Sequence, residues 1–391
     1  MPQAERIHTR LDALWNVARG AAGGADRPAY SPVEAAAMRL VAGWAREAGL
    51  EPGVDAYGNL WALPSGTARV VSAGSHVDTV PDGGRYDGAL GTVLGLELAL
   101  EAENAGVLIC AAEEAPRFGA GTIGSRLLNG TLSVDALSGL VDADGVNATD
   151  ALAEYLEALG DLPRIAPPVK RIRAHAEVHV AQRRELRELG IVRTVAAPRR
   201  LQVVLTGRAG HSGEVSMEAR HDALPAAAEV VLAVEAAARA EPPETVATVG
   251  RLAVAPGAIS VIPERTTLLV DVRAVAKESL DRLQAGIESR AAEIAAARGL
   301  DLTVSQLRAG DPVTLDRDLA DRALRAAGDL GVPATETWSG AGHDAQHLAT
   351  LLPTLLVFVP LHGGESHTPQ EGADMDEILA AAAVVAAALR A

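Results

Sequence analysis

Residues 105–119 read AGVLICAAEEAPRFG, an apolar run that ends in two adjacent glutamates. Residues 107–112 have the length and composition of a buried strand, and Glu113 and Glu114 follow at its carboxyl end. In open α/β sheets, ligands gather at the carboxyl ends of the strands. This stretch therefore predicts an α/β fold and the position of a site within it.

A second stretch has the same arrangement of an apolar strand followed by polar side chains. Residues 68–88 read ARVVSAGSHVDTVPDGGRYDG, in which an apolar strand is followed by His76, Asp78 and Asp87. Histidine and carboxylate side chains thus leave two separate strands at the same edge of the predicted sheet. This pattern indicates a metal site with a general base beside it.

Two further histidine groups lie later in the chain. In RIRAHAEVHVAQ the alternation of residue types places Glu177 and His179 on one face of a strand, and LHGGESHTPQE contributes His362 and His367. A single histidine is usually structural, but several groups at strand ends of one sheet favour a site. Imidazole and carboxylate ligands without a thiolate suit zinc, manganese or cobalt.

The order of predicted elements changes along the chain. Strands and helices alternate over residues 54–130, whereas residues 198–309 follow the order βαββαβ of a ferredoxin-like sandwich, with a helix over 217–240 in which Pro225 could introduce a kink. We expect an α/β catalytic domain with a mixed, mostly parallel sheet flanked by helices, formed by residues 1–197 and 310–391. Residues 198–309 form an inserted α+β domain.

Composition limits the class of partner and the compartment. The 391 residues carry a formal net charge of −16, which argues against nucleic acid and against an anionic membrane surface. The single cysteine, Cys110, lies in the apolar run VLIC, so no intramolecular disulfide is possible and a reducing compartment is expected. The N-terminus lacks the apolar core of a signal peptide, and the apolar run 378–389 is too short to span a bilayer. These features predict a cytoplasmic protein.

Six segments carry a family resemblance: GSHVDTVPDGGRYDGALG, EEAPRFGAGTIGSR, EVHVAQ, GRAGHSG, SGAGHDAQ and ESHTPQE. In this order they resemble the hydantoinase/carbamoylase family of dinuclear-metal amidohydrolases, within the aminoacylase and carboxypeptidase superfamily. That family includes N-carbamoyl-L-amino-acid hydrolase, allantoate amidohydrolase and β-ureidopropionase. The resemblance covers the chain from about residue 5 to the C-terminus.

The resemblance implies two divalent metal ions per subunit, most often zinc. One ion is held by His76, Asp87 and His179, and the second by Asp87, Glu114 and His367, so that the Asp87 carboxylate bridges them. Two cations that share an aspartate can hold one hydroxide between them. Glu113 is then the general base, and Asp78 orients the His76 imidazole.

The resemblance also implies a homodimer, in which the inserted domain serves as the dimerisation or lid domain. His211 would stabilise the substrate's carbonyl oxygen from the neighbouring subunit, and Arg273 would bind a substrate carboxylate through both oxygens. The expected substrate cradle adds Gln182, Ser260, Gly342 and His343. The remaining histidines near these motifs, which are predicted to be structural or solvent-exposed, are His175, His221, His347 and His362.

The chain departs from the family pattern only around the substrate. After EVH the family usually continues I-E-Q-G, whereas this chain has Ala181 in place of the glutamate and Arg183 in place of the glycine. After GHSG it has EVSM instead of T-T-P-M. Ser260 replaces an asparagine, and Glu365 replaces a small or apolar residue. The metal chemistry is therefore expected to be intact, while the substrate can differ from the family's usual one.

The sequence predicts an amidohydrolase that cleaves the C–N bond of an N-carbamoyl amino acid or a related ureido acid, such as allantoate, by attack of a metal-bound hydroxide. Alternatives are a dipeptidase or N-acyl-amino-acid deacylase of the same superfamily, or a specialised amide hydrolase of secondary metabolism. His179 favours the carbamoylases, because many of the peptidases use a carboxylate there. A non-catalytic binding protein on the same fold is the alternative from a different class.

Overall fold

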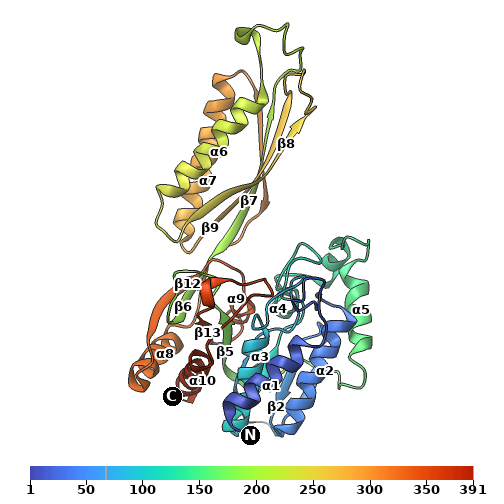
Figure 1. Ribbon diagram of the computed structural model, residues 1–391, viewed down its shortest axis with the longest axis vertical. Coiled ribbons are helices and arrows are strands. Elements are labelled where there is room, and N and C mark those ends of the chain that lie inside the picture. The colour runs from blue at the N-terminus through green and yellow to red at the C-terminus, as the bar shows by residue number, and fades with distance from the viewer. Residues whose placement is uncertain (67, 391) are drawn as a thin grey trace. The chain divides into compact units, whose positions relative to one another are not determined.

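The computed structural model describes residues 1–66 and 68–390, which divide into two compact units (Figure 1). Unit 1 comprises Met1–Arg193, Thr314–Thr337 and Gly342–Ala391, and unit 2 comprises Thr194–Val313 and Trp338–Ala341. The expected insert, residues 198–309, lies within unit 2.

Unit 1 is built on a mixed sheet with the strand order β1-β2-β4-β3-β5-β13-β6-β11, to which β12 adds by pairing with β6. Its centre is parallel, since β3 pairs in parallel with β4 and β5, and β5 with β13. The flanking pairs β1–β2, β2–β4 and β6–β13 are antiparallel. The strands are β1 Glu51–Val54, β2 Leu60–Leu63, β3 Val70–Gly74, β4 Ala105–Ile109, β5 Ile172–Val180, β6 Leu189–Val195, β11 Val313–Thr314, β12 Ala334–Ser339 and β13 Thr354–Val359.

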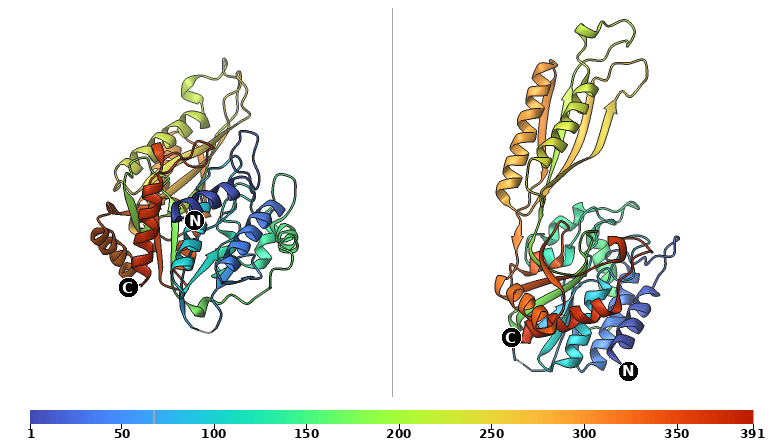
Figure 2. Two further views of the ribbon diagram at one scale, coloured as in Figure 1. Left: turned by 60° about the horizontal axis from the view of Figure 1, so that its bottom comes forward. Right: turned by 60° about the vertical axis from the view of Figure 1, so that its left-hand side comes forward.

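Helices flank this sheet (Figures 1 and 2). They are α1 Gln3–Trp15, α2 Pro32–Glu47, α3 Ala89–Glu101, α4 Ile123–Leu128, α5 Ala148–Ala158, α8 Arg317–Leu330, α9 Asp344–Leu348 and α10 Met375–Arg390. Short 3-10 turns are η1 Val134–Gly139, η2 Val169–Arg171 and η4 His362–Gly364. None of the described helices has the length and apolar character needed to cross a membrane.

The strands alternate between two cores. Leu60 and Ala62 of β2 face the larger core beneath α1, α2, α3 and α10, whereas Trp61 faces a smaller one that includes Leu348 of α9. Such alternation follows from the two-residue period of a strand. Helix α3 is buried along most of its length, and a Cβ on Gly91 would lie 2.1 Å from the Val178 carbonyl oxygen. Glycine there lets α3 approach the sheet closely.

Unit 2 is a four-stranded antiparallel sheet in the order β10-β7-β9-β8, with two helices packed on one apolar core. The strands are β7 Ala197–Thr206, β8 Val246–Ala255, β9 Arg265–Ala274 and β10 Asp301–Arg308, and the helices are α6 Ala223–Arg239 and α7 Lys277–Ala297, with a 3-10 turn η3 at Met217–Ala219. The chain order βαββαβ and this strand order are those of the ferredoxin-like sandwich. The predicted α/β fold class with a mixed, mostly parallel sheet is confirmed.

The predicted helix over residues 217–240 is confirmed as α6, but it begins later than predicted and the possible kink at Pro225 is absent from it. Helix α6 begins at Ala223, where the Asp222 side chain accepts a hydrogen bond from the Leu224 backbone N–H. Pro225 therefore lies in the first turn, where a missing N–H leaves no helical hydrogen bond unmade. The proline helps to begin the helix and does not bend it.

Candidate metal centre

The parallel centre of the sheet brings distant segments together at one edge. His76 follows β3, Glu113 and Glu114 follow β4, and His179 lies near the end of β5. The carboxyl ends of parallel strands point the same way, so residues that leave them converge. His367 lies beyond β13, which pairs in parallel with β5.

Three of the predicted ligands form a buried cluster. His76 Nε2 lies 3.4 Å from His179 Nε2, and Asp87 Oδ1 lies 3.0 Å from His179 Nε2 and 3.6 Å from His76 Nε2. Tetrahedral ligands bound at zinc–nitrogen distances lie about 3.3 Å apart. Asp87 Oδ1 has no geometrically satisfied hydrogen bond among the described residues, although His179 Nε2 lies close to it. The spacing and this unsatisfied oxygen fit a divalent cation.

A second cluster shares the same aspartate. Asp87 Oδ2 lies 3.1 Å from His367 Nε2, which is 3.5 Å from Glu114 Oε1. One oxygen of Asp87 therefore faces each cluster, as the predicted bridging role requires. His367 adopts a left-handed backbone conformation with φ 59°, which is uncommon for a residue with a side chain. Such strained residues concentrate at functional sites.

The buried carboxylates at this edge of the sheet are poorly neutralised by other groups of the protein. Burial raises the pKa of Glu113 well above its ordinary value, and burial together with the Asp87 charge raises the pKa of Glu114 to about 7. Burial opposes the charged form of His76, yet its contacts with Asp78 and Asp87 raise its pKa well above the ordinary value. Buried carboxylates gathered in this way suit cations.

Asp78 has a wider role than orienting His76. Its Oδ1 lies 3.4 Å from His76 Nδ1, which is also 3.1 Å from the Asp78 carbonyl oxygen. The same carboxylate accepts the backbone N–H groups of Glu113 at 3.1 Å and Glu114 at 2.9 Å. Asp78 thereby links the segment that follows β3 to the acidic pair that follows β4.

Glu177 and His362 lie outside the two clusters that share Asp87. The Glu177 carboxylate accepts hydrogen bonds from Ser75 Oγ and from the Ala345 backbone N–H, and so fixes the start of α9. The exposed His362 pairs with Asp374 at 3.0 Å. Both therefore have structural partners.

Other predicted residues of unit 1 lie beside the clusters. Gln182 Nε2 is 3.1 Å from His367 Nε2 and 3.4 Å from Asp87 Oδ2. His343, which follows Gly342, is buried and packs edge-on against His179 with ring centroids 4.5 Å apart. Burial lowers the pKa of His343 well below its ordinary value, so the ring is neutral. Glu177, His179 and His343 form a third group of possible ligand atoms.

Residues where the chain departs from the family pattern have different surroundings. Ala181 is buried and its backbone N–H donates to the Val359 carbonyl, whereas Arg183 donates to Thr337 Oγ1. Glu365 is exposed, two residues before His367.

The remaining predicted residues belong to unit 2. His211 and Ser260 lie together, because His211 pairs with Val261 and the Ser212 N–H donates to the Ser260 carbonyl. Arg273 lies near the other end of β9, where it donates to Asp271 Oδ2 at 2.8 Å and to the Gly340 carbonyl at 2.7 Å.

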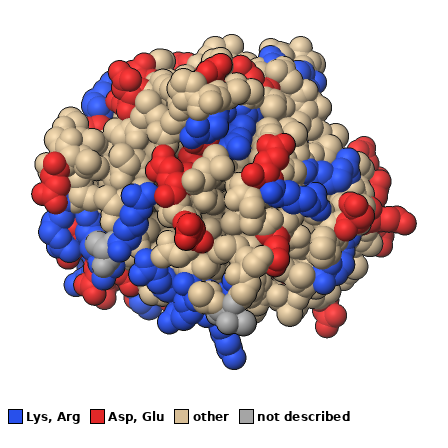
Figure 3. Space-filling model, turned by 90° about the horizontal axis from the view of Figure 1, so that it is seen from below, with Lys and Arg blue, Asp and Glu red and all other residues tan. Residues whose placement is uncertain are grey.

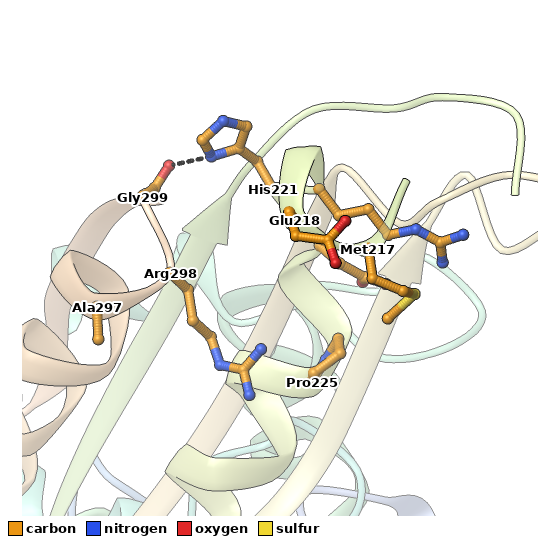
Figure 4. A pocket seen from close by; sticks show the side chains of 9 residues that line it. Met217, Glu218, His221, Pro225, Ala297, Arg298 and Gly299 are labelled. Carbon is orange, nitrogen blue, oxygen red and sulfur yellow. Dashed lines mark hydrogen bonds between the residues drawn. The ribbon is translucent and has the colours of Figure 1, made fainter. Parts of the chain in front are cut away.

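A pocket of about 420 Å³ in unit 2 lies outside the predicted site (Figure 4). Figure 4 shows His221 at this pocket, where its Nδ1 donates to the Gly299 carbonyl at 2.9 Å. Arg298, which also lines it, pairs with Glu229. His221 thus has a structural hydrogen bond, in keeping with its predicted role.

Sequence reasoning missed Glu371. Its carboxylate accepts the backbone N–H groups of Tyr86 and Asp87 and the hydroxyl of Ser366, so it ties together the loops that carry Asp87 and His367. Its place in ESHTPQE, four residues after His367, is a signal that could have revealed it.

Comparison with known proteins identifies the family. A model of peptidase family M20/M25/M40 matches residues 73–391. The chain belongs to peptidase family M20/M25/M40. Within it, the N-carbamoyl-L-amino acid amidohydrolase of Geobacillus stearothermophilus is 36% identical over 98% of this chain and 97% of that protein. The ureidoglycolate hydrolase of Oryza sativa subsp. japonica is 30% identical over 99% of this chain and 84% of that protein.

A solved structure of this family gives the same picture. The hydantoinase/carbamoylase family amidase from Burkholderia multivorans superposes with a TM-score of 0.88 and 32% identity, over 99% of this chain and 97% of that one. The predicted resemblance to the hydantoinase/carbamoylase amidohydrolases is confirmed, and with it the assignment to hydrolases of carbon–nitrogen bonds. M20 family enzymes use divalent metal ions, and the two clusters described above are the candidate ligands.

Proposed function

We propose that this protein hydrolyses a C–N bond of an N-carbamoyl amino acid or a related ureido acid with the help of two divalent metal ions. The observation that carries the proposal is the Asp87 carboxylate, which turns one oxygen to His179 and the other to His367. Relatives that align along nearly the whole chain are named for cleaving such compounds.

The proposed first site consists of His76, Asp87 and His179, and the second of Asp87, Glu114 and His367. Zinc suits these ligands best, and manganese or cobalt would also suit them. Two cations bound there would polarise the substrate carbonyl and lower the pKa of a water between them.

Glu113 is the proposed general base and acid. Its Oε2 lies 3.9 Å from His76 Nε2, beside the clusters and outside both ligand sets. Burial raises its pKa above the ordinary value, which makes its carboxylate a stronger acceptor for the proton of the attacking water. Glu113 would then deliver that proton to the leaving nitrogen. Water adds across the C–N bond, which releases an amine and a carbamate.

The geometry of unit 2 supports a shared site in a homodimer. From Arg265 to Arg273 strand β9 advances eight residues, or about 26 Å, and His211 lies beyond the Arg265 end. One small substrate cannot touch His211 and Arg273 of the same chain across that distance. We therefore propose that they serve different active sites of a dimer, with His211 acting on the neighbouring subunit's substrate.

Strand β8 offers a surface for this dimer. It is an edge strand of the unit 2 sheet, and its residues Val246 and Leu252 are 47% and 41% exposed. An unpaired edge is a template for another strand. We propose that β8 contributes to the contact between two copies.

Arg273 is the proposed carboxylate anchor. A guanidinium can bind both oxygens of a carboxylate at once. Gln182, Ser260, Gly342 and His343 would complete the cradle. Because Ala181, Arg183, Ser260 and Glu365 differ from the usual family residues, we propose an acid substrate with an unusual remainder. The lone, buried Cys110 and the excess of negative charge fit a cytoplasmic protein without a nucleic-acid or membrane partner, and acidic and basic side chains are interspersed on the face in Figure 3.

A substrate panel tests the proposal. Purified protein is reconstituted with zinc, manganese or cobalt and assayed with N-carbamoyl-L-amino acids, allantoate and ureidoglycolate, and in parallel with N-acetyl amino acids and dipeptides. Faster turnover of at least one ureido acid than of the matched acetyl compound is expected. A preference for a dipeptide or an N-acyl amino acid would contradict the proposal and favour the deacylase or peptidase alternative.

A further inference from the structure

The turn that carries the acidic pair is held by side chains instead of by a neighbouring strand. Strand β4 ends at Ile109, and the backbone N–H of Ala111 then donates to Asn59 Oδ1 at 3.0 Å. The N–H of Ala112 donates to Glu34 Oε1 at 2.9 Å, and the next two N–H groups donate to Asp78. Four consecutive N–H groups are thus fixed by three buried side chains.

Glu34 is the member of this set that lies in a helix. It lies in the first turn of α2 and is fully buried, and its second oxygen, Oε2, accepts the Tyr30 N–H at 2.5 Å. Both residues that donate to Glu34 are left-handed, with φ 50° at Tyr30 and φ 54° at Ala112. This conformation disfavours residues with a side chain and persists only where the surroundings enforce it.

A second contact ties the same segments together. Arg117, three residues after the acidic pair, donates from Nη1 to the carbonyl oxygens of Ala29 and Tyr30 at 2.7 and 2.8 Å. Residues 29–34 therefore form hydrogen bonds with the turn on both sides of Glu113 and Glu114, to Ala112 before the pair and to Arg117 after it. Glu34 holds the residue before the pair, and Arg117, three residues after the pair, is held by the Ala29 and Tyr30 carbonyls.

We infer that Glu34 is a positioning residue for the reaction: it holds Ala112 in its left-handed conformation and so sets the direction of Glu113 and Glu114. The inference rests on the proposed roles of those two glutamates. The competing explanation is that Glu34 only fixes the entry into α2, where Ser31 caps the helix by accepting the Glu34 N–H and Glu34 accepts the N–H of Tyr30, the residue before the cap. That role requires the Tyr30 contact but not the Ala112 contact.

The test variant is Glu34→Gln, with Ser31→Ala as its matched control. Glutamine can accept from only one of the two N–H groups, because its amide NH2 would oppose the other. Ser31→Ala removes the hydroxyl that accepts the Glu34 N–H at 3.1 Å, so it weakens the same helix start and leaves the Ala112 contact intact. Each variant is measured for melting temperature, kcat, KM and the visible absorption spectrum after loading with cobalt(II).

Glu34→Gln is expected to lower kcat about tenfold or more, with KM changed much less, and to alter the cobalt spectrum, since a small misplacement of catalytic groups is costly. Ser31→Ala should lower the melting temperature while kcat and the spectrum stay as in the parent. Adding Ala112→Gly to Glu34→Gln should restore part of the lost kcat and the parent spectrum, because glycine adopts positive φ without strain.

Equal effects of Glu34→Gln and Ser31→Ala on kcat and spectrum, or no recovery with Ala112→Gly, would overturn the inference. If Glu34→Gln does not fold, Glu34→Asp replaces it, since the shorter carboxylate cannot span both N–H groups. If the parent hydrolyses none of the ureido acids, the proposed substrate class fails, and the cobalt spectra of the same variants still decide the role of Glu34.

Discussion

Asp87 Oδ2 lies 3.1 Å from His367 Nε2, although the two residues are 280 positions apart (367 − 87) in the sequence. The carboxylate's other oxygen faces the His76 and His179 imidazoles. One side chain therefore joins the ligand group supplied by the first half of the chain to the histidine supplied by its last segment. In the proposed second metal site this link supplies the third candidate ligand beside Glu114 and His367.

Replacement of His76 or His367, one histidine from each proposed metal site, should remove metal. His76→Ala and His367→Ala each delete one of the few ligands of a cluster, so bound metal and activity should fall together. Metal per chain is measured by elemental analysis after dialysis. His362→Ala is the matched control, since His362 is exposed and pairs with Asp374, outside both clusters. Unchanged metal content in both cluster variants would disprove these ligand assignments.

Glu113→Gln should separate catalysis from metal binding. The amide cannot take a proton from water, so kcat should fall by about 10²-fold or more while the fold and most of the metal are kept. Glu114→Gln should instead lose metal, because Glu114 belongs to the second cluster. Loss of metal from the Glu113 variant together with an active Glu114 variant would show that the two roles are reversed.

The shared site can be tested by mixing two inactive variants. If His211 serves the neighbouring subunit, a heterodimer of Glu113→Gln and His211→Ala contains one complete site. Random exchange should then restore about a quarter of the parent activity. His221→Ala, which alters another histidine of unit 2, should be active without mixing. Absence of recovery despite proven subunit exchange would place His211 elsewhere.

The carboxylate of the substrate should be required. Arg273→Lys keeps the charge but loses the two-point geometry, so kcat/KM should fall substantially. The amide of a good substrate should react poorly with the parent enzyme for the same reason. Arg200→Lys is the control, because Arg200 contacts the same Asp271 carboxylate. Equal rates for acid and amide would exclude Arg273 as the anchor.

The buried His175 should make folding stability depend on pH. Burial lowers its pKa to about 3, and its Nδ1 lies 2.9 Å from Ser72 Oγ. The unfolded chain, with an ordinary histidine pKa near 6.5, binds the proton more readily, so stability falls as pH drops from about 6.5 towards 3. Between pH 7 and pH 5 this group should account for a loss of about 2 kcal/mol. Urea unfolding of His175→Gln should lack that part of the loss; an identical loss in both proteins would refute the assignment.

The sequence was informative where a residue's role follows from its place at a strand end. Glu113, Asp87 and His179 could be located because apolar runs reveal the strands, and parallel strands deliver their ends to one edge. The ferredoxin-like order of strands and helices in unit 2 could also be predicted, from the patterns of apolar and polar residues. Helix α5 at Ala148–Ala158 was not predicted, although Asn147 provides an N-cap for it.

Hydrogen bonds between segments that are distant in the sequence could not be predicted from it. The pair Ser31 and Glu34 predicts a helix start, but nothing local indicates that the second Glu34 oxygen reaches Ala112. The same holds for Asp78, whose bonds to the Glu113 and Glu114 N–H groups depend on a turn geometry set by packing. Local patterns specify elements, whereas these contacts depend on how the elements meet.

Two-metal hydrolysis of a ureido acid is tested most directly by adding metal stepwise to metal-free protein during turnover of an N-carbamoyl-L-amino acid. Cobalt or manganese is added in steps, and release of the free amino acid is followed at each ratio of metal to protein. A two-metal amidohydrolase should show negligible turnover without metal and a rise that ends near two ions per chain. Full turnover in rigorously metal-free protein, or no turnover of any ureido acid with two ions bound, would contradict the proposed function.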